Sequence, residues 1–168
     1  MARRASFTLV LLAVVFAPVL VLVFGHRIAE RGRGLAPGTY LPAGELATLE
    51  GRRVHTDSWR GRPTLLVLFS STCHACQRQL STLIDVAADF PEVRVVLLSL
   101  DQASPSFDVP FEVLQDPTGQ FVRKSRRFIV PTIYWIDRDG KVLHGRSGLR
   151  SPSEDKALLM RFFHGEKR

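Results

Sequence analysis

The feature that most constrains how this chain can fold is an apolar run that leads directly into its only two cysteines. Residues 64–69, TLLVLF, are continuously hydrophobic, as expected of a strand that is buried on both faces. Cys73 and Cys76 follow in a Cys-x-x-Cys spacing, and after them comes an apolar helical face formed by Leu80, Leu83, Ile84 and Ala87. The sequence therefore predicts that a strand places both sulfurs at the start of a helix.

Alternating strand and helix patterns surround this unit and predict one α/β domain. Residues 93–100 form a second apolar run after Pro91, so strand, helix and strand make a βαβ unit with two parallel strands. Asp139 and Gly140 stand between two apolar runs, which is a strong hairpin signal. The other expected elements are strands at 45–49, 52–55, 111–114, 132–136 and 141–144, a helix at about 120–127, and a last helix that Ser151 or Ser153 would cap and that carries Leu158, Leu159, Phe162 and Phe163.

The N-terminus has the composition of a membrane anchor. From Phe7 to Phe24 there is no charged residue, and with Ala5 and Ser6 the run would span about 27–30 Å as a helix, close to the hydrocarbon thickness of a bilayer. A cleaved signal peptide is the alternative, but the run is longer than a usual signal core and no Ala-x-Ala pattern follows it. The domains expected are an uncleaved transmembrane helix at 1–25, a linker at 26–44 and a globular domain at 45–168.

The arginines beside the apolar run bear on its orientation. Arg3 and Arg4 favour an N-terminus inside the cell, whereas a second cluster argues the other way: Arg27, Arg31 and Arg33. Because anchors with a short N-terminal tail usually keep that tail inside, we expect a single-pass protein of the bacterial inner membrane. Its domain would then face the periplasm.

Charge and cysteine content narrow the function classes. Residues 1–33 carry four of the seven net positive charges, so the rest of the chain is only mildly basic and no nucleic-acid partner is required. Two cysteines are too few for the disulfide framework of a secreted domain or for a four-cysteine zinc site. The pair can be a staple, half of a metal site or a redox couple. A staple would gain little chain entropy from so short a loop, which favours the redox couple.

A redox pair needs one exposed thiolate and one sheltered sulfur that can attack in turn. Cys73, directly before the helix, would point outward at the positive end of the helix dipole, which lowers the pKa of a thiol below its free value of about 8.5. We predict Cys73 as the nucleophile and Cys76 as the resolving cysteine, with no cofactor besides the redox-active pair and no metal. His74 is predicted to tune the thiolate, although an exposed turn residue is the simpler interpretation.

Pro131 stands directly before the predicted strand at 132–136, where a proline cannot donate a ladder hydrogen bond. A cis Val130–Pro131 bond would explain this position by turning the chain beside the sulfurs and exposing backbone groups to a substrate strand. Only about 5–6% of prolyl bonds are cis, so the position alone leaves the isomer open.

The order of these motifs resembles the thioredoxin superfamily, and within it the membrane-anchored TlpA/ResA branch of redoxins and the similar proteins that assist methylamine dehydrogenase maturation. The resemblance implies a thioredoxin-like fold with helices on both sides of a central mixed sheet, a cis Pro131 as substrate wall, and thiol–disulfide exchange at Cys73 and Cys76. Substrate contacts are predicted at Thr72, Val130 and Thr132. The matches that carry it, within residues 46–149, are Gly61-Arg62-Pro63, the Cys73–Cys76 pair, Pro131-Thr132 and residues 136–141, IDRDGK.

The same resemblance implies partners. These are protein dithiols or disulfides, such as apocytochrome c or a periplasmic enzyme under maturation, together with an electron donor or acceptor in the membrane. The direction of exchange stays open. Related anchored proteins act mostly as reductants, whereas a histidine between the cysteines is typical of strongly oxidising members.

Four positions depart from the pattern of this family. Thr72 and Ser81 replace a usual tryptophan and a usual proline, and Gln79 replaces a usual glutamate. Val67 stands where thioredoxin has a buried aspartate. No carboxylate of the family remains to deprotonate Cys76, and three proton acceptors stay open: His74, Asp101 and water.

Three other interpretations of the cysteine pair stay open. A peroxiredoxin-like peroxidase shares the fold, and Ser70 fits its hydroxyl position, but Leu66 occupies its proline position. A non-enzymatic Cu(I)-binding maturation module would use both sulfurs and His74, whose place between them is poor geometry for a third ligand. A purely structural pair is the last alternative.

Overall fold

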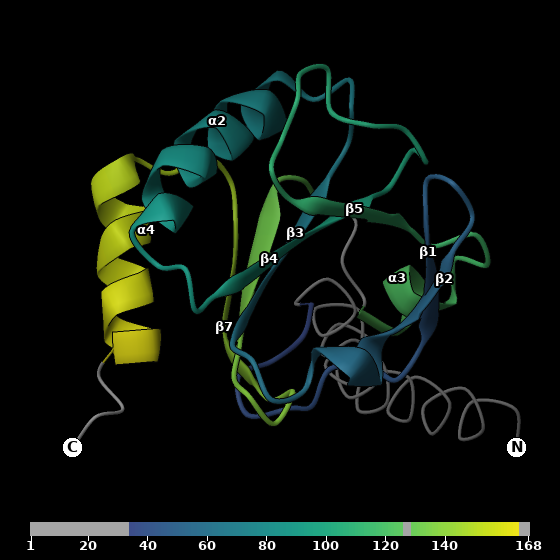
Figure 1. Ribbon diagram of the computed structural model, residues 1–168, viewed down its shortest axis with the longest axis horizontal. Helices are drawn as coiled ribbons and strands as arrows, with labels where there is room; N and C mark the ends of the chain where they lie inside the picture. The colour runs from purple at the N-terminus through teal and green to yellow at the C-terminus, as the bar shows by residue number, and fades with distance from the viewer. Residues whose placement is uncertain (1–33, 126–128, 165–168) are drawn as a thin grey trace, which may run out of the picture. The chain divides into compact units, whose positions relative to one another are not determined.

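The computed structural model describes residues 34–125 and 129–164, and Figure 1 shows how their helices and strands are arranged. The predicted anchor at 1–25, and the orientation argued from its arginines, lie outside the described residues. Within the described ranges, no helix is long and apolar enough to cross a membrane. The fold below is therefore that of the globular domain alone.

A seven-stranded mixed sheet, in the order β2-β1-β5-β4-β3-β6-β7, forms the centre of the domain. Strands β3, β4 and β5 are parallel, and every other neighbouring pair in the sheet is antiparallel. The strands predicted from the sequence are confirmed, with small shifts at their ends. Their bounds are β1 (Glu45–Thr48), β2 (Arg53–His55), β3 (Thr64–Phe69), β4 (Arg94–Ser99), β5 (Glu112–Gln115), β6 (Thr132–Ile136) and β7 (Val142–Ser147).

Strand β3 has the central position that its unbroken apolar sequence predicts. All six of its residues are buried, and it pairs with β4 on one side and with β6 on the other. Helix α2 (His74–Ala88) connects β3 to the parallel β4, which confirms the βαβ unit. The helix ends two residues before Phe90, which is buried against the core ahead of Pro91.

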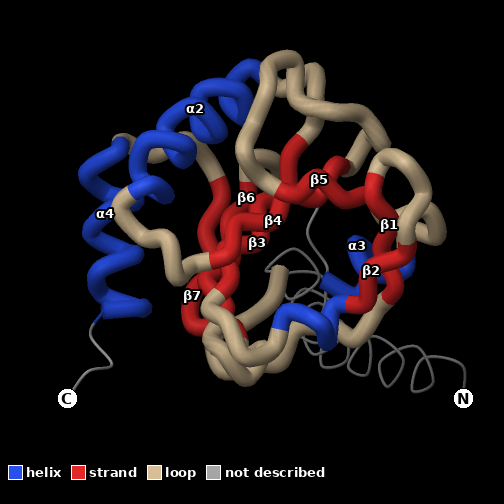
Figure 2. The backbone as a smooth tube through the Cα atoms, viewed as in Figure 1, coloured by secondary structure: helices blue, strands red, loops and turns tan. Residues whose placement is uncertain are grey.

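Helices cover the two faces of this sheet, as Figures 1 and 2 show. Alternate side chains of β3 point to opposite faces, so Leu65, Val67 and Phe69 pack in one core and Leu66 and Leu68 in the other. The first core lies under α2 and α4 (Pro152–Leu159), which continues into the π-helical turn η2 (Met160–His164). The second contains residues of the 3₁₀ turn η1 (Thr56–Trp59) and of α3 (Gln120–Ser125).

The start of the domain differs from the prediction, which assigned all of 26–44 to a linker. Leu35 is buried in the second core, and its amide donates to the Tyr134 hydroxyl at 3.2 Å. The amide of Gly38 donates to the Val142 carbonyl at 2.7 Å, and Tyr40 forms an isolated bridge with Lys141. The segment from residue 34 onward therefore belongs to the domain. It is held by irregular backbone hydrogen bonds, which leave no periodic pattern in the sequence.

Helix α4 begins at a complete capping box, which decides between the two caps that the sequence left open. The Ser151 hydroxyl accepts from the amide of Glu154, the Glu154 carboxylate accepts from the amide of Ser151, and Pro152 is the first helical residue. Of the four apolar residues predicted to pack, Leu159 is buried and the others are partly buried against the same core: Leu158, Phe162 and Phe163.

Candidate active site

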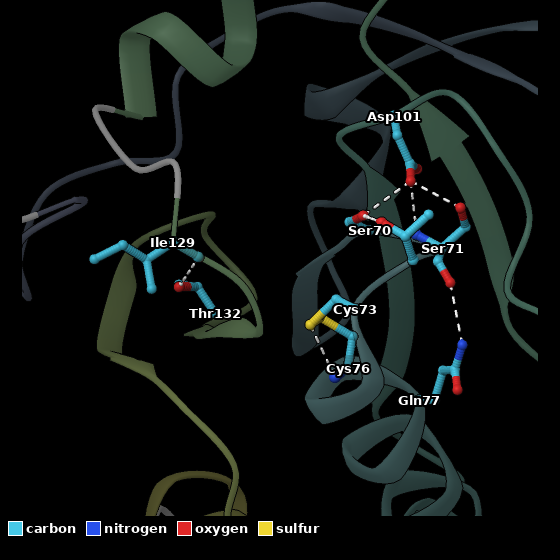
Figure 3. The surroundings of a disulfide bond; sticks show 9 residues. Ser70, Ser71, Cys73, Cys76, Gln77, Asp101, Ile129 and Thr132 are labelled. Atoms are coloured by element: carbon cyan, nitrogen blue, oxygen red, sulfur yellow. Dashed lines mark hydrogen bonds between the residues drawn. A yellow bond between two sulfur atoms is a disulfide. The ribbon is translucent and has the colours of Figure 1, made fainter.

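The two cysteines form a disulfide at the N-terminus of α2, where the sequence placed them (Figure 3). Cys73 is the N-cap of the helix, and its sulfur accepts a hydrogen bond from the amide of Cys76 at 3.1 Å. Cys76 has no exposed surface, whereas Cys73 is partly exposed. The pair therefore has one accessible and one sheltered sulfur, and the helix dipole is positive at the accessible one.

Two predicted neighbours of Cys73, Thr72 and His74, are both exposed. His74 is the first residue of α2, and its side chain makes no hydrogen bond or ion pair within the described part of the chain. The Thr72 hydroxyl lies 3.1 Å from that of Ser70. Both side chains are thus open to a docking partner. Tuning of the thiolate by His74 and a substrate contact at Thr72 stay predictions.

Asp101 anchors the loop that leads into the helix. It follows β4, and one of its carboxylate oxygens accepts from the Ser70 hydroxyl at 2.9 Å and from the Ser71 hydroxyl and amide, both at 2.8 Å. The other oxygen accepts from Ser99 at 2.9 Å. In Figure 3 the carboxylate points at Ser70 and Ser71.

These hydrogen bonds bear on Asp101 as the proton acceptor for Cys76, which the sequence left open. Burial raises the pKa of Asp101, but the hydrogen bonds from Ser71, Ser70 and Ser99 outweigh it and lower the pKa to about 2. A carboxylate this acidic is a weak base, and it is aimed at the loop. The geometry therefore favours a role in holding the loop over proton transfer at Cys76.

The loop before β6 faces the disulfide from the other side. The Val130–Pro131 peptide bond is cis, as the resemblance implied. The Pro131 carbonyl accepts from the amide of Gly148 at 2.8 Å, which ties the loop to the end of β7. Ile129 keeps 56% of its surface exposed and lies opposite Cys73 in Figure 3. Nothing in the sequence marks Ile129 as part of the site, because a lone exposed apolar residue carries no pattern.

Thr132 occupies a different environment from the one its predicted substrate contact needs. It is fully buried, and its hydroxyl donates to the Ile129 carbonyl at 2.6 Å and lies 2.5 Å from the Ser147 hydroxyl. The Thr132 side chain therefore supports the loop from beneath. Val130, by contrast, is partly exposed, so a substrate contact there stays a prediction.

The two positions where the family has carboxylates are buried and uncharged. Val67 and Gln79 both have no exposed surface. Gln79 lies one helical turn after Cys76, and its amide is hydrogen-bonded to Asp155 and to the backbone of Arg150. Neither Asp155 nor Arg150 could be linked to this position from the sequence, because both are more than 70 residues away in the chain. No cluster of three metal-binding side chains occurs among the described residues.

Comparison with known protein families finds one that covers most of the described domain. The AhpC/TSA family matches residues 37–144. A thiol-disulfide oxidoreductase named ResA from Bacillus thuringiensis subsp. konkukian is 22% identical over 131 residues, which cover 73% of this chain and 76% of the relative.

Solved structures share the fold. A thiol:disulfide interchange protein, DsbE, from Chlorobium tepidum superposes with a TM-score of 0.67 and 27% identity, covering 77% of this chain and 97% of that one. A secreted disulfide oxidoreductase of Mycobacterium tuberculosis superposes with a TM-score of 0.57 and 21% identity, covering 70% and 95%. The predicted thioredoxin-like fold with its central mixed sheet is thereby confirmed.

Proposed function

The chain belongs to the AhpC/TSA family, and we propose that it is a membrane-anchored thiol–disulfide oxidoreductase that exchanges disulfides with partner proteins outside the cytoplasm. The activity is of the ResA and DsbE type, the type of relatives and solved structures that it resembles. The observation that carries the proposal is the disulfide at the helix start, with Cys73 accessible and Cys76 sheltered.

The exchange proceeds in two balanced steps. In the reducing direction, the Cys73 thiolate attacks one sulfur of a substrate disulfide, so that a Cys73–substrate bond forms and the other substrate sulfur leaves as a thiolate. The Cys76 thiolate then attacks Cys73, which forms the disulfide of the structure and releases the second substrate thiolate. Two electrons pass from the protein to the substrate. The oxidising direction is the reverse of both steps.

Each element around the disulfide has a part in this scheme. The positive end of α2 stabilises the Cys73 thiolate, and the exposed His74 adds charge when it is protonated. The cis Pro131 loop forms the wall against which an extended substrate segment lies, with Thr72 and Val130 as its neighbours. Substrates of this class are proteins with a dithiol or disulfide, such as apocytochrome c or an enzyme under maturation.

The anchor and location rest on the sequence and on a relative. The charge-free run at 7–24 has the length of a membrane span, and one structural relative is described as secreted. A protein on the outer face of the inner membrane would exchange electrons with a membrane partner. Removal of residues 1–25 is expected to move the protein from the membrane fraction to the soluble fraction, and a truncated protein that stays with the membrane would argue against the anchor.

Exchange with a small test disulfide is the direct experiment. We expect Cys73→Ser to abolish turnover and Cys76→Ser to accumulate a mixed disulfide with the substrate, because only the second step is then blocked. Ser153→Ala, on the surface of α4, is a matched control that should keep full activity. Turnover by Cys73→Ser would refute the assignment. Rapid consumption of peroxide by the wild-type protein, with no disulfide exchange, would favour a peroxidase, and Cu(I) retention without exchange a metal-binding module.

The reduction potential of the Cys73–Cys76 pair determines the direction. A value near about −270 mV would mark a reductant and one near about −120 mV an oxidant. Equilibration with defined ratios of reduced and oxidised glutathione measures it.

A further inference from the structure

A buried polar cluster joins α2 to α4 behind the disulfide. The Gln79 side chain donates to one carboxylate oxygen of Asp155 at 2.5 Å and accepts from the backbone amide of Arg150 at 2.8 Å. The Arg150 guanidinium donates from Nε to the other oxygen of Asp155 at 2.6 Å, and both side chains are only 1% exposed. A fully desolvated ion pair is therefore connected to α2 through one glutamine.

The arginine of this pair is only partly satisfied. Its Nη1 and Nη2 atoms are buried and have no hydrogen-bond partner among the described residues, and the guanidinium lies 4.8 Å from the centre of the Trp135 ring. A contact with an aromatic face compensates for part of the lost hydration, but unpaired buried donors carry a free-energy cost. Apolar residues of similar volume would usually be at least as stable here. The cost calls for an explanation beyond stability.

Cys76 lies one helical turn before Gln79, which contacts this pair. Cys76 and Gln79 are three residues apart on one buried face of α2, where Cβ atoms are about 5–6 Å apart, so the carboxylate that Gln79 contacts lies on the order of 10 Å from the sulfur. Two charges at about 10 Å with an effective dielectric constant of about 20 shift each other by about one pKa unit. The sheltered sulfur must become a thiolate each time it resolves a mixed disulfide.

We infer that Asp155 and Arg150, held to α2 by Gln79, are positioning residues whose opposite charges set how readily the Cys76 thiol ionises. Asp155 disfavours the thiolate and Arg150 favours it, and the intact pair keeps their effects in balance. The inference rests on the proposed exchange function. It adds that two buried charges affect the step in which Cys76 resolves the mixed disulfide. Residues around the start of α4 would thereby influence the chemistry of the cysteines at the start of α2.

Other titratable groups in this part of the domain could also affect the ionisation of Cys76. His74 on α2 is exposed, and Asp101 after β4 is bound by serines. His144 on β7 stacks with Phe162 and lies 5.3 Å from the Trp135 ring. Burial lowers the pKa of His144, and the nearby positive charges lower it further in the order Arg150, Arg146 and Arg161. None of these groups contacts Gln79 among the described residues. The charges of Asp155 and Arg150 can therefore be changed without replacing any of the others.

The test measures the ionisation of Cys76 directly. In a Cys73→Ser background Cys76 is the only thiol, and ¹³C-labelled cysteine reports its titration by NMR. Asp155→Asn should increase the acid ionisation constant of Cys76 about tenfold, because the positive Arg150 is left unbalanced. Arg150→Met should decrease it about tenfold, and the double variant should return close to the background. Shifts of opposite sign separate charge from damage, since a loosened core would move both variants the same way.

The chain offers a control in the exposed pair between Lys156 and Asp89, which connects the same two helices. Asp89→Asn should leave the Cys76 titration unchanged. If Asp155→Asn or Arg150→Met fails to fold, Gln79→Glu places a new carboxylate at the link and should decrease the ionisation constant. Equal titration in all folded variants, or shifts of the same sign in Asp155→Asn and Arg150→Met, would overturn the inference. Neither result would touch the exchange function, which Cys73→Ser tests in the otherwise intact protein.

Discussion

Two aspartates, Asp101 and Asp155, lie on either side of the cysteine pair in opposite environments. Asp101 is exposed and accepts hydrogen bonds from hydroxyl and amide donors of Ser70, Ser71 and Ser99. Asp155 is buried and is paired with a cation, Arg150, and an amide. The first carboxylate orders the loop before Cys73, and the second contacts the helix flank behind Cys76.

The difference shows what each environment requires of a charge. Asp101 keeps access to water, so replacing it removes hydrogen bonds but leaves no opposite charge without a partner. Asp155 and Arg150 have exchanged water for each other, so the loss of either leaves a buried charge without compensation. Replacing Asp101 near the accessible Cys73 is therefore expected to destabilise the fold only slightly. Near the sheltered Cys76, by contrast, the buried charges are neutralised only while Asp155 and Arg150 are both present.

The largest effect is expected from breaking the buried pair. Arg150→Met should lower the free energy of unfolding by about 3–5 kcal/mol, because Asp155 remains buried without a cation. Urea unfolding followed by tryptophan fluorescence measures it, with Trp135 beside the site as a reporter. Replacing Asp155 by leucine in the same protein should recover most of the loss. A single variant that loses less than about 1 kcal/mol would mean that Asp155 finds water or another partner.

A smaller, pH-dependent effect is expected at Asp101. Its pKa in the folded protein is depressed to about 2 from an ordinary value of 3.8, so the stabilisation is present above 3.8 and is lost as the pH falls through about 2. After discounting for solvent screening at an exposed group, we expect Asp101→Asn to cost about 1 kcal/mol at pH 6.

Unfolding of the wild type and of Asp101→Asn in urea at a series of pH values checks this expectation. The difference between the two proteins should shrink between pH 4 and pH 2. Asp108→Asn, at an exposed aspartate further along the same loop, is the control and should show no such difference. A gap that stays constant down to pH 2 would show that the Asp101 charge contributes nothing to stability.

The features that the sequence predicted are those that depend on neighbours in the chain. The apolar run of β3, the helical face after Cys76 and the Asp139-Gly140 turn are local patterns, and each element formed as expected. Pro131 could be read as unusual because of the strand after it. The position of the cysteines at the start of α2 and the cis bond before Pro131 are confirmed, whereas the roles of the site residues stay predictions.

The features that were missed depend on contacts between distant segments. Nothing in the local sequence distinguishes Asp155, which reads as an ordinary first-turn acid of α4, from an exposed residue. Asp155 is connected to the site only through its hydrogen bond with Gln79, 76 residues earlier in the chain. The packing of Leu35 on Tyr134 is similar, because a single hydrogen bond across 99 residues leaves no periodicity. Gln79 in place of a glutamate showed that this position of α2 lacks a carboxylate, but not that Asp155 of α4 supplies one beside it.

The smallest effect should come from the exposed pair between α4 and the end of α2. Lys156 and Asp89 are separated by 2.6 Å, the same distance as Arg150 and Asp155, but their side chains are 55% and 53% exposed. Water screens such a pair, and ordering the long lysine side chain offsets much of the attraction, so Lys156→Gln should cost less than about 0.5 kcal/mol. Urea unfolding at low and high salt measures it, and the small cost should vanish at high salt. Because the distance between the charged atoms is the same, a loss near that of Arg150→Met would mean that burial is not what distinguishes the two pairs. A loss within experimental error would agree with burial as the origin of the large effect at Arg150.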